Sequence, residues 1–461
     1  MTEQIGIWIE AASPRILHPI WLRFRASPLS VRLAHGVFWS LVGAALARGL
    51  GVVSSIIVAR MLGITAFGEF TMIQSTVGLF GTFAGLGLGI TATKYVAELR
   101  ETDPARCGRI MGLILLVASV GGLVAAAALT LFAPWIAAHT LAAPQLAPLL
   151  RVGATLVLFN TLQGVYSGAL GGFEAFKRVA QVNWLGAVLG TPLLVLCTFA
   201  DGIRGAVWGS IIQIVIGCAI GHFALLKEAA KRNVVLSYAP VRSDYTILWQ
   251  FSLPAFLSST ISGPASWACT TFLANQNQGY SEVALMNAAG QWRNFLVFLP
   301  INMAAVLVPM FSSLYYTGKR AEFEKLLRRN MMINVGVCLA LYIPLALFAS
   351  NIMNWYGAGF KRGVPVFLVT LGGTALAAAN YLFSRAMQAT GRAWLDMVFA
   401  AFWAASLIVS SFLLVPAFKA LGLAWAQVFA AFVMAVWQSR LVRKLFIAPE
   451  AMSQGKRVPT N

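Results

Sequence analysis

The chain has 461 residues, of which 59% are hydrophobic and only 11% are charged. A water-soluble domain carries about a quarter charged residues, so this composition excludes an ordinary soluble enzyme and a disordered chain. The net charge of +19 would suggest nucleic acid in a soluble protein, but cytoplasmic loops of membrane proteins also collect Lys and Arg. We therefore expect an all-α polytopic membrane protein with no nucleic-acid partner.

The apolar residues form blocks of about 20 residues, the length with which an α-helix crosses a bilayer. The segment 1–35 precedes the first block, and we expect it to be a cytoplasmic tail or a short helix on the membrane surface, without a cleavable signal. Twelve spans then follow in chain order, at 36–59, 68–92, 109–132, 147–170, 179–200, 205–226, 247–272, 283–308, 330–349, 364–388, 394–416 and 421–441.

The distribution of positive charge tests this number of spans. If both ends of the chain are cytoplasmic, the two tails and every second loop lie on the inner side. That side then holds 26 of the 34 Lys and Arg residues, the outer side holds six, and the remaining two lie near the middle of spans. An excess of positive charge on the inner side is the usual pattern in membrane proteins. We therefore predict twelve spans with both termini in the cytoplasm.

Short motifs recur in the two halves of the chain. The segment 172–179 begins Gly-Phe-Glu-Ala and 205–208 reads Gly-Ala-Val-Trp, with one apolar span between them. Their counterparts in the second half are 391–394 (Gly-Arg-Ala-Trp) and 422–425 (Gly-Leu-Ala-Trp), which follow at nearly equal offsets. Because six is an even number, two six-span repeats insert in the same orientation, which predicts pseudo-symmetric lobes about an axis along the membrane normal.

This repeat divides the chain into two six-helix lobes and their connections. After the tail at 1–35, we assign the N-lobe to 36–226, a cytoplasmic linker to 227–246, the C-lobe to 247–441 and a C-terminal cytoplasmic tail to 442–461.

Two positive charges, Arg48 and Arg293, lie near the middle of spans, one in each half. A charged side chain at the bilayer centre costs about 2.5–3.5 kcal/mol on insertion scales and usually faces a bundle interior or a wet cavity. No Asp or Glu lies in the middle of any predicted span, so neither arginine has an obvious carboxylate partner. A guanidinium in such a place suits phosphate oxygens, although it could also simply bind carbonyls of a neighbouring helix.

Polar residues at helical spacing mark further candidates for substrate contacts. Asn160 and Gln163 align on the fourth span, and Gln291 and Asn294 lie on the eighth, where Arg293 is rotated well away from Gln291. These amides could bind sugar hydroxyls. On the second span, Gln74 aligns with Gly78, Gly81 and Gly85, and we interpret this stripe of small residues as a helix-packing seam.

Lys94 and Arg385 lie near the inner ends of their spans. Snorkelling towards lipid headgroups is the default interpretation, and a port of access for an anionic headgroup is the alternative. Gly85, Gly87 and Gly89 are expected inside a helix and are not a dinucleotide-binding motif. We find no nucleophile signature and no cluster of metal ligands, and we expect no metal, no other cofactor and no catalysis.

Loose motifs follow one another along most of the chain. They lie at 59–63 (Ala-Arg-Met-Leu-Gly), 67–70 (Phe-Gly-Glu-Phe), 85–87, 94–96, 172–177 and 389–392, together with Pro309, Pro416 and Gly422. From about 36 to 445 the chain resembles the Wzx-type polysaccharide flippases of the MATE-like multidrug/oligosaccharidyl-lipid/polysaccharide exporter superfamily.

The resemblance implies a fold and a function. It implies a MATE-like pair of six-helix lobes in the bacterial inner membrane, which moves a polyprenyl-pyrophosphate-linked oligosaccharide from the inner to the outer leaflet by alternating access. Its partners would be this lipid-linked substrate, membrane lipids and polysaccharide polymerase machinery. Such flippases have cationic cavities, which Arg48 and Arg293 would supply here. Related drug exporters often carry an acid in the first helix, where this chain has Arg48.

Two other functions stay open. One is a cation-coupled exporter of small amphiphiles of the same superfamily, whose cargo would have to be anionic or neutral because Arg48 repels cations. The other is a scaffold of a glycan-assembly complex that transports nothing, in which replacing Arg48 or Arg293 would be harmless.

Overall fold

The computed structural model describes residues 28–238, 252, 256, 260–389 and 393–442. All regular secondary structure in these ranges is helical, which confirms the predicted all-α class. Eight helices among the described residues are long and apolar enough to cross a membrane. Three of these eight contain a sharp bend between two arms, and each arm corresponds to one predicted span. The eight helices together therefore account for eleven of the predicted spans. The remaining span, 247–272, lies partly outside the described residues.

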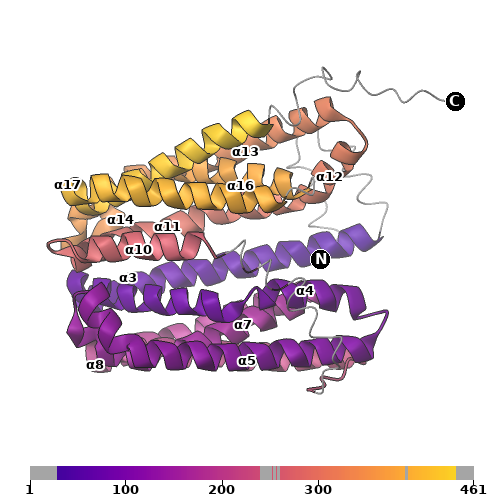
Figure 1. Ribbon diagram of the computed structural model, residues 1–461, viewed down its shortest axis with the longest axis horizontal. Helices are drawn as coiled ribbons and strands as arrows, with labels where there is room; N and C mark the ends of the chain where they lie inside the picture. Colours follow the sequence, from indigo (N-terminus) through magenta and orange to yellow (C-terminus); the bar gives the residue numbers. More distant parts are fainter. Residues whose placement is uncertain (1–27, 239–251, 253–255, 257–259, 390–392, 443–461) are drawn as a thin grey trace.

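The first half of the chain forms one layer of packed helices and the second half forms another (Figure 1). The first half consists of α3 (Pro28–Gly85), α4 (Leu88–Leu99), α5 (Pro104–Trp135), the π-helix η1 (Ile136–Thr140), the 3₁₀-helix η2 (Pro144–Leu146), α6 (Ala147–Gly153), α7 (Thr155–Gly172) and α8 (Phe176–Lys231). The second half consists of α10 (Ser262–Ala274), α11 (Gly279–Val306), α12 (Val308–Tyr316), α13 (Arg320–Leu347), α14 (Ala349–Trp355), the 3₁₀-helix η5 (Ala358–Gly363), α15 (Val364–Gly372), α16 (Thr374–Ala389) and α17 (Ala393–Val442).

Three helices each contain a sharp bend between two arms. A straight helix of the length of α3 would measure about 87 Å, nearly three times the hydrocarbon thickness of about 30 Å. Gly63 interrupts it with φ 77° and ψ 170°. Asp201 and Gly202 interrupt α8, and Lys419 interrupts α17 with φ 50°. Each bend therefore takes only one or two residues, and each arm is long enough to form a single span.

Two of these bends, one in each half, are followed by the same close contact between a glycine and a backbone carbonyl. A Cβ atom on Gly205 would lie 1.8 Å from the carbonyl oxygen of Cys197, and one on Gly422 would lie 2.3 Å from that of Leu414. The two glycines correspond to each other in the sequence repeat, and so do Cys197 and Leu414. The recurring glycines are therefore explained by packing, because only glycine lets the two arms approach so closely just after the bend.

The second predicted span is not one continuous helix. We expected Gly85, Gly87 and Gly89 inside a helix, but the helix breaks between α3 and α4, where Leu86 and Gly87 adopt positive φ angles of 41° and 67°. Glycine adopts this conformation without strain. The packing of α4 on α7 is tight, since a Cβ on Gly168 would lie 2.0 Å from the carbonyl oxygen of Gly89.

Contacts between distant segments define the two ends of the bundle. At one end, Arg100 donates hydrogen bonds to the Gly172 carbonyl at 2.8 Å and to Glu174 at 2.6 Å, and Arg232 donates to the Phe173 carbonyl at 2.8 Å. We call this the inner end, after its predicted side. The opposite end, here the outer end, carries the bends at Gly63 and Lys419. The loops between the described helices therefore alternate between the two ends, in agreement with the predicted topology.

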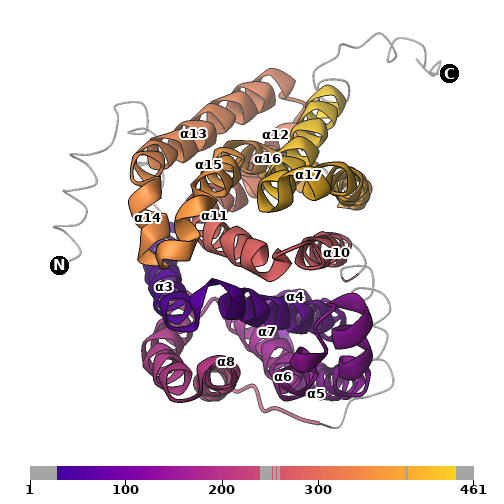
Figure 2. The ribbon, with the colours of Figure 1, turned by 90° about the vertical axis from the view of Figure 1, so that its left-hand side faces the viewer.

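The two layers meet where α3 packs along α11 (Figure 2). A Cβ on Gly68 would lie 1.8 Å from the carbonyl oxygen of Tyr280, so the two backbones touch near the outer end. Further along the same arm of α3, Trp267 of α10 donates a hydrogen bond to Thr76 at 3.1 Å. We call the contact surface of α3 and α4 with α10 and α11 the lobe seam.

Large apolar side chains cover much of the remaining surface. Phe199, Leu347 and Leu131 are among the most exposed, with 83%, 78% and 77% of their surface accessible. Such exposure is costly in water and expected in hydrocarbon. The surface composition therefore agrees with a membrane environment.

The helices extend beyond the predicted boundaries of the lobes. Helix α3 begins at Pro28, within the expected N-terminal tail, and α8 continues to Lys231, within the expected linker. Residues 232–238 then run along α5, where Ser237 donates a backbone hydrogen bond to Gly108 at 3.2 Å. The segments 1–27, 239–246 and 443–461 lie outside the described residues, and the division into domains stays a prediction.

The contacts of the glycines at the bends predict that Gly→Ala changes within helices differ in their effect on the stability of the protein. Replacing Gly205 or Gly422 by alanine should destabilise the protein by about 1–3 kcal/mol, because the new Cβ overlaps a backbone carbonyl. The matched control is Gly336→Ala in α13, where a Cβ meets no atom within 4 Å. That change should be neutral or stabilising by up to about 1 kcal/mol. Thermal unfolding of the purified protein in one detergent would compare all three, and equal melting temperatures would contradict the packing interpretation.

Candidate functional site

Arg48 lies on the lobe seam, deep within the bundle. It precedes the bend at Gly63 by 15 residues. Because this bend lies at the outer end of the bundle, Arg48 is about 22 Å from that end. The side chain is exposed, and its guanidinium lies 4.0 Å from the ring centre of Phe298 on α11. Among the described residues no carboxylate pairs with it, and Cβ atoms on the neighbouring Gly49 and Gly51 would meet no atom within 4 Å. The structure thus combines a mid-depth cation with open space beside it.

Arg293 lies at a similar depth but in a different environment. It follows the start of α11 by 14 residues, about 21 Å from the outer end. Its side chain is half-buried, and Nη1 donates a hydrogen bond of 3.4 Å to Oε1 of Gln427 on α17. No carboxylate within the described ranges pairs with it either. Arg293 is therefore held inside the second layer rather than at the lobe seam.

Arg48 contacts one face of α11, and the side chain of Arg293 leaves this helix from another face. Arg293 and Phe298 are five residues apart on this helix, so their side chains leave the axis about 140° apart. The structure accordingly does not place Arg48 and Arg293 on one face of α11. It brings Arg48 to the face that carries Phe298 and, one turn earlier, Asn294, whose side chain is exposed. Gln291 is half-buried on the same helix.

The hydrogen bond of Arg293 has a counterpart in the first layer. Gln74 of α3 donates to Ser210 of α8 at 3.0 Å. The two donors, Gln74 and Arg293, correspond to each other in the sequence repeat, and so do the two acceptors, Ser210 and Gln427. Sequence reasoning missed both acceptors. Applying the repeat offset to polar residues inside the spans would have indicated them.

The polar residues of the fourth span do not share one environment. Asn160 is exposed on α7, whereas Gln163 packs against α8, with a Cβ on Gly217 lying 3.7 Å from its amide. The Oε1 atom of Gln163 is buried without a hydrogen-bond partner in the structure. Asn160 is therefore accessible to a ligand and Gln163 is part of a helix contact.

The glycine stripe on α3 is not the packing seam that we expected. Cβ atoms on Gly78, Gly81 and Gly85 would each meet no atom within 4 Å. Hydropathy and spacing could not show this, because small residues serve close packing and open surfaces equally well. The second arm of α3 thus presents an open face that begins one turn after Gln74.

The two cations proposed as a port of access lie in different lobes. Lys94 is exposed on α4, with its ammonium 4.8 Å from the ring centre of Tyr95. Arg385 of α16 donates to Gln388 at 2.8 Å and lies over the ring of Tyr381 at 5.3 Å. Each is therefore beside a tyrosine of its own helix.

Hydrogen bonds close the outer end of the lobe seam. The hydroxyls of Thr65 and Ser281, at the outer ends of α3's second arm and of α11, lie 3.1 Å apart. Asn275 donates to the Thr140 carbonyl at 2.9 Å, and the Tyr280 hydroxyl donates to the Leu141 carbonyl at 2.8 Å. We call these contacts the outer junction. Sequence reasoning did not find it, because the partners in each pair are far apart along the chain and belong to different lobes.

Comparison with known proteins assigns the chain to a family. Residues 33–315 match the sequence profile of the family described as polysaccharide biosynthesis protein. The chain is 26% identical over 379 residues to the EPS I polysaccharide export inner membrane protein EpsE of Ralstonia nicotianae, covering 81% of this chain and 85% of the relative. It is 25% identical over 347 residues to stage V sporulation protein B of Bacillus subtilis, covering 70% and 65%.

Solved structures share the fold. An inward-facing multidrug resistance MATE family transporter of the MOP superfamily aligns with a TM-score of 0.70 at 16% identity, over 88% of this chain and 98% of that one. The lipid II flippase MurJ in an inward closed conformation aligns with a TM-score of 0.70 at 14% identity, over 88% and 87%. The MATE-like fold is therefore confirmed.

These findings agree with the motifs that resemble Wzx-type flippases. The matched profile covers more than half of the chain, and the relatives align along both layers of helices. The protein is a membrane transporter and not an enzyme, and it belongs to the polysaccharide biosynthesis protein family.

Proposed function

We propose that the protein flips a polyprenyl-pyrophosphate-linked oligosaccharide from the inner to the outer leaflet of a bacterial inner membrane, for the assembly of a surface polysaccharide such as O-antigen, capsule or exopolysaccharide. Both termini lie in the cytoplasm, and transport proceeds by alternating access between the two lobes. The observation that carries this proposal is Arg48, an exposed cation at mid-depth on the lobe seam without a carboxylate partner among the described residues.

The energetics of Arg48 favour an anionic ligand. Its contact with Phe298 contributes only about 0.5–2 kcal/mol, against about 2.5–3.5 kcal/mol for placing a charge at the bilayer centre. A diphosphate would offset the rest, because a guanidinium binds phosphate oxygens through two parallel hydrogen bonds. Open space beside Gly49 and Gly51 leaves room for such a group.

The other proposed residues take graded roles. Arg293 adds positive potential at the same depth and contacts the pyrophosphate only if it leaves Gln427. The exposed amides of Asn160 and Asn294 bind sugar hydroxyls, and the half-buried Gln291 lies on the same helix as Asn294. Gln163 binds sugar only if it leaves its contact with α8. In this scheme the isoprenoid chain stays in lipid, and Lys94 and Arg385 attract the headgroup at the inner end. A polysaccharide polymerase receives the product.

One alternative has an observation in its favour. The fold is shared with a multidrug resistance transporter, so export of small amphiphiles fits the architecture. Arg48 would repel cationic drugs from the lobe seam, which restricts this alternative to anionic or neutral cargo. Dye-efflux assays with cationic and anionic dyes would separate the two functions, because a lipid-linked glycan flippase should export neither.

Replacing Arg48 should impair glycan export more than replacing Arg293. In cells that lack the native gene, Arg48→Gln should lower surface glycan about 10- to 100-fold and raise lipid-linked precursor, since a charge-assisted hydrogen bond contributes about 1.5–3 kcal/mol. Arg293→Gln should have a smaller effect, because Arg293 already has a partner. Surface glycan and precursor are measured at matched membrane levels of each variant.

The matched control is Arg151→Gln, which removes an exposed arginine of α6 near the outer end. It should leave export unchanged. Normal export by both Arg48→Gln and Arg293→Gln would contradict the proposed pyrophosphate site and favour a scaffold.

Locking the outer junction should stop transport. In a variant without the five native cysteines, Thr65→Cys and Ser281→Cys should form a disulfide, because the native hydroxyl oxygens lie 3.1 Å apart. Oxidation should abolish glycan export in cells and reduction should restore it, while either single cysteine has no effect. Full crosslinking with normal export would exclude opening of this junction from the transport cycle.

The membrane potential should drive export of the anionic headgroup. An inside-negative potential favours outward movement by about 2.3 kcal/mol per charge per 100 mV. In vesicles, dissipating the potential with valinomycin and balanced potassium at constant pH should therefore slow flipping severalfold. Nigericin, which removes the pH gradient, should not. The reverse pattern would instead identify proton antiport as the source of energy.

A further inference from the structure

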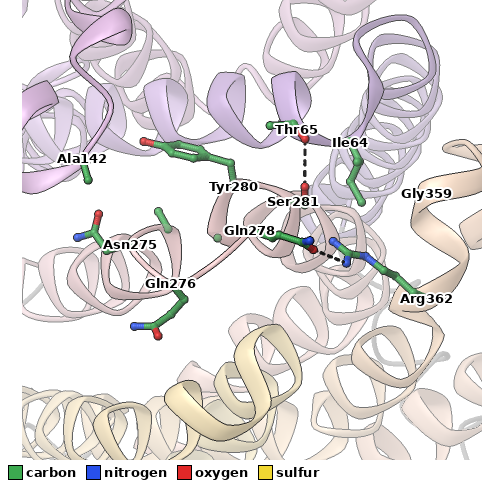
Figure 3. Close-up of a pocket in the computed structure, with 12 residues that line it drawn as sticks. Ile64, Thr65, Ala142, Asn275, Gln276, Gln278, Tyr280, Ser281, Gly359 and Arg362 are labelled. Atoms are coloured by element: carbon green, nitrogen blue, oxygen red, sulfur yellow. Dashed lines mark hydrogen bonds between the residues drawn. The ribbon is translucent and has the colours of Figure 1, made fainter.

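A cavity of about 770 Å³ lies at the outer end, immediately beside the outer junction (Figure 3). Four segments that are distant in sequence line it, namely the start of the second arm of α3, the loop before η2, the turn between α10 and α11, and η5. We call this cavity the outer vestibule. Its polar lining includes Thr65, Asn275, Gln276, Gln278, Tyr280 and Arg362. Its volume lies within the range of about 300–1,000 Å³ that is usual for small-ligand sites.

The lining is polar but carries little net charge. Arg362 is its only cation among the described residues, and that charge is compensated by Glu282, whose carboxylate lies 3.3 Å from Nη2. Nη1 of Arg362 also donates to Oε1 of Gln278 at 3.1 Å, as Figure 3 shows. Because the guanidinium already pairs with Glu282 and donates to Gln278, the vestibule has no strong attraction for a phosphate. This differs from the surroundings of Arg48.

Amide and hydroxyl groups supply the remaining polar surface. The side-chain amides of Asn275, Gln276 and Gln278 keep hydrogen-bonding capacity beyond their bonds to Thr140, Phe272 and Arg362, and Thr65 and Tyr280 add hydroxyl oxygens that can accept. The ring of Tyr280 lies between Ala142 and Thr65 in Figure 3 and provides a flat apolar surface. A ligand with many hydroxyl groups and an apolar face matches this combination, and this is the chemistry of an uncharged sugar ring.

Both lobes contribute residues to the lining of the outer vestibule. Thr65 and Ala142 belong to the first layer, and Asn275 to Tyr280 and Arg362 to the second. Asn275 and Tyr280 also form the outer junction, through their bonds to Thr140 and Leu141. A ligand in the vestibule would therefore contact both lobes at the end where a flipped headgroup emerges.

We propose that the outer vestibule is a binding site for uncharged sugar residues of the exported glycan, separate from the pyrophosphate site at Arg48. This inference rests on the proposed function for the identity of the glycan. Recognition is thus divided along the path, with the charged headgroup bound at mid-depth and the neutral saccharide bound at the outer face.

Direct binding to the full-length protein in lipid nanodiscs tests this site. The probe is the oligosaccharide released by mild acid from lipid-linked precursor of the host that lacks the native gene, purified free of phosphate. Calorimetry should detect binding to the wild type, and Gln276→Ala combined with Gln278→Ala should weaken it at least tenfold. Gln276→Trp, which fills the cavity, should have the same effect. Inorganic pyrophosphate should not compete.

The matched control is Asn351→Ala combined with Asn354→Ala, two exposed amides of α14 that do not line the vestibule. It should bind like the wild type. No binding to the wild type, unchanged binding by both vestibule variants, or competition by pyrophosphate would each overturn the proposal. Thermal unfolding of each variant separates loss of the site from loss of the fold.

The same variants distinguish this proposal from the proposed function. If the wild type failed to restore glycan export in the deletion host, the flippase function would fall, whatever the binding data showed. If export were restored and sugar binding were unaffected by the vestibule variants, only the proposed sugar site in the vestibule would be refuted.

Discussion

The contact between α3 and α11 is the constraint on which the two-lobe arrangement depends. Gly68 and the Tyr280 carbonyl meet there without an intervening side chain, and the Thr65 and Ser281 hydroxyls lie beside them. In hydrocarbon there is little hydrophobic force to hold two helix bundles together, so close backbone packing and hydrogen bonds have to do so. This is one of the most extensive contacts between two helices, but among the described residues few other elements of the two lobes touch, so the packing within each lobe is more extensive in total. The contact can therefore hold one arrangement of the lobes and still yield to another.

The two lobes share their architecture and differ in charge. Both place a polar bond between corresponding helices, but the first lobe uses the neutral pair Gln74 and Ser210 and the second uses Arg293 and Gln427. Arg48 then adds a second cation from the first lobe at similar depth. A scaffold of two similar lobes thus carries an asymmetric set of polar and charged groups, and under the proposed function this asymmetry would let a single headgroup bind in one orientation.

Hydropathy and charge were enough to predict the positions and order of the eleven spans that lie within the described residues, because each helix must satisfy its own backbone inside the membrane. They also identified Arg48 and Arg293 as unusual. They could not predict the rotation of each helix, so the glycines at 78, 81 and 85 were assigned to a packing seam that they do not form. The partner of Arg293 lies on a helix distant in sequence, and α4, which begins after the break at Gly85, packs closely on α7. Both are tertiary effects that a local pattern does not contain.

The sharp bends within α3, α8 and α17 also bear on how the protein is made. At Gly205 and Gly422 the two arms are already in backbone contact within a few residues of the bend. The second arm of each pair therefore meets its partner as soon as it leaves the ribosome-bound insertion channel. Biogenesis can then proceed hairpin by hairpin, with each pair shielding its close-packed glycine surface from lipid before the next pair arrives. Lobe assembly would follow as the joining of preformed hairpins, with the lobe seam closing last.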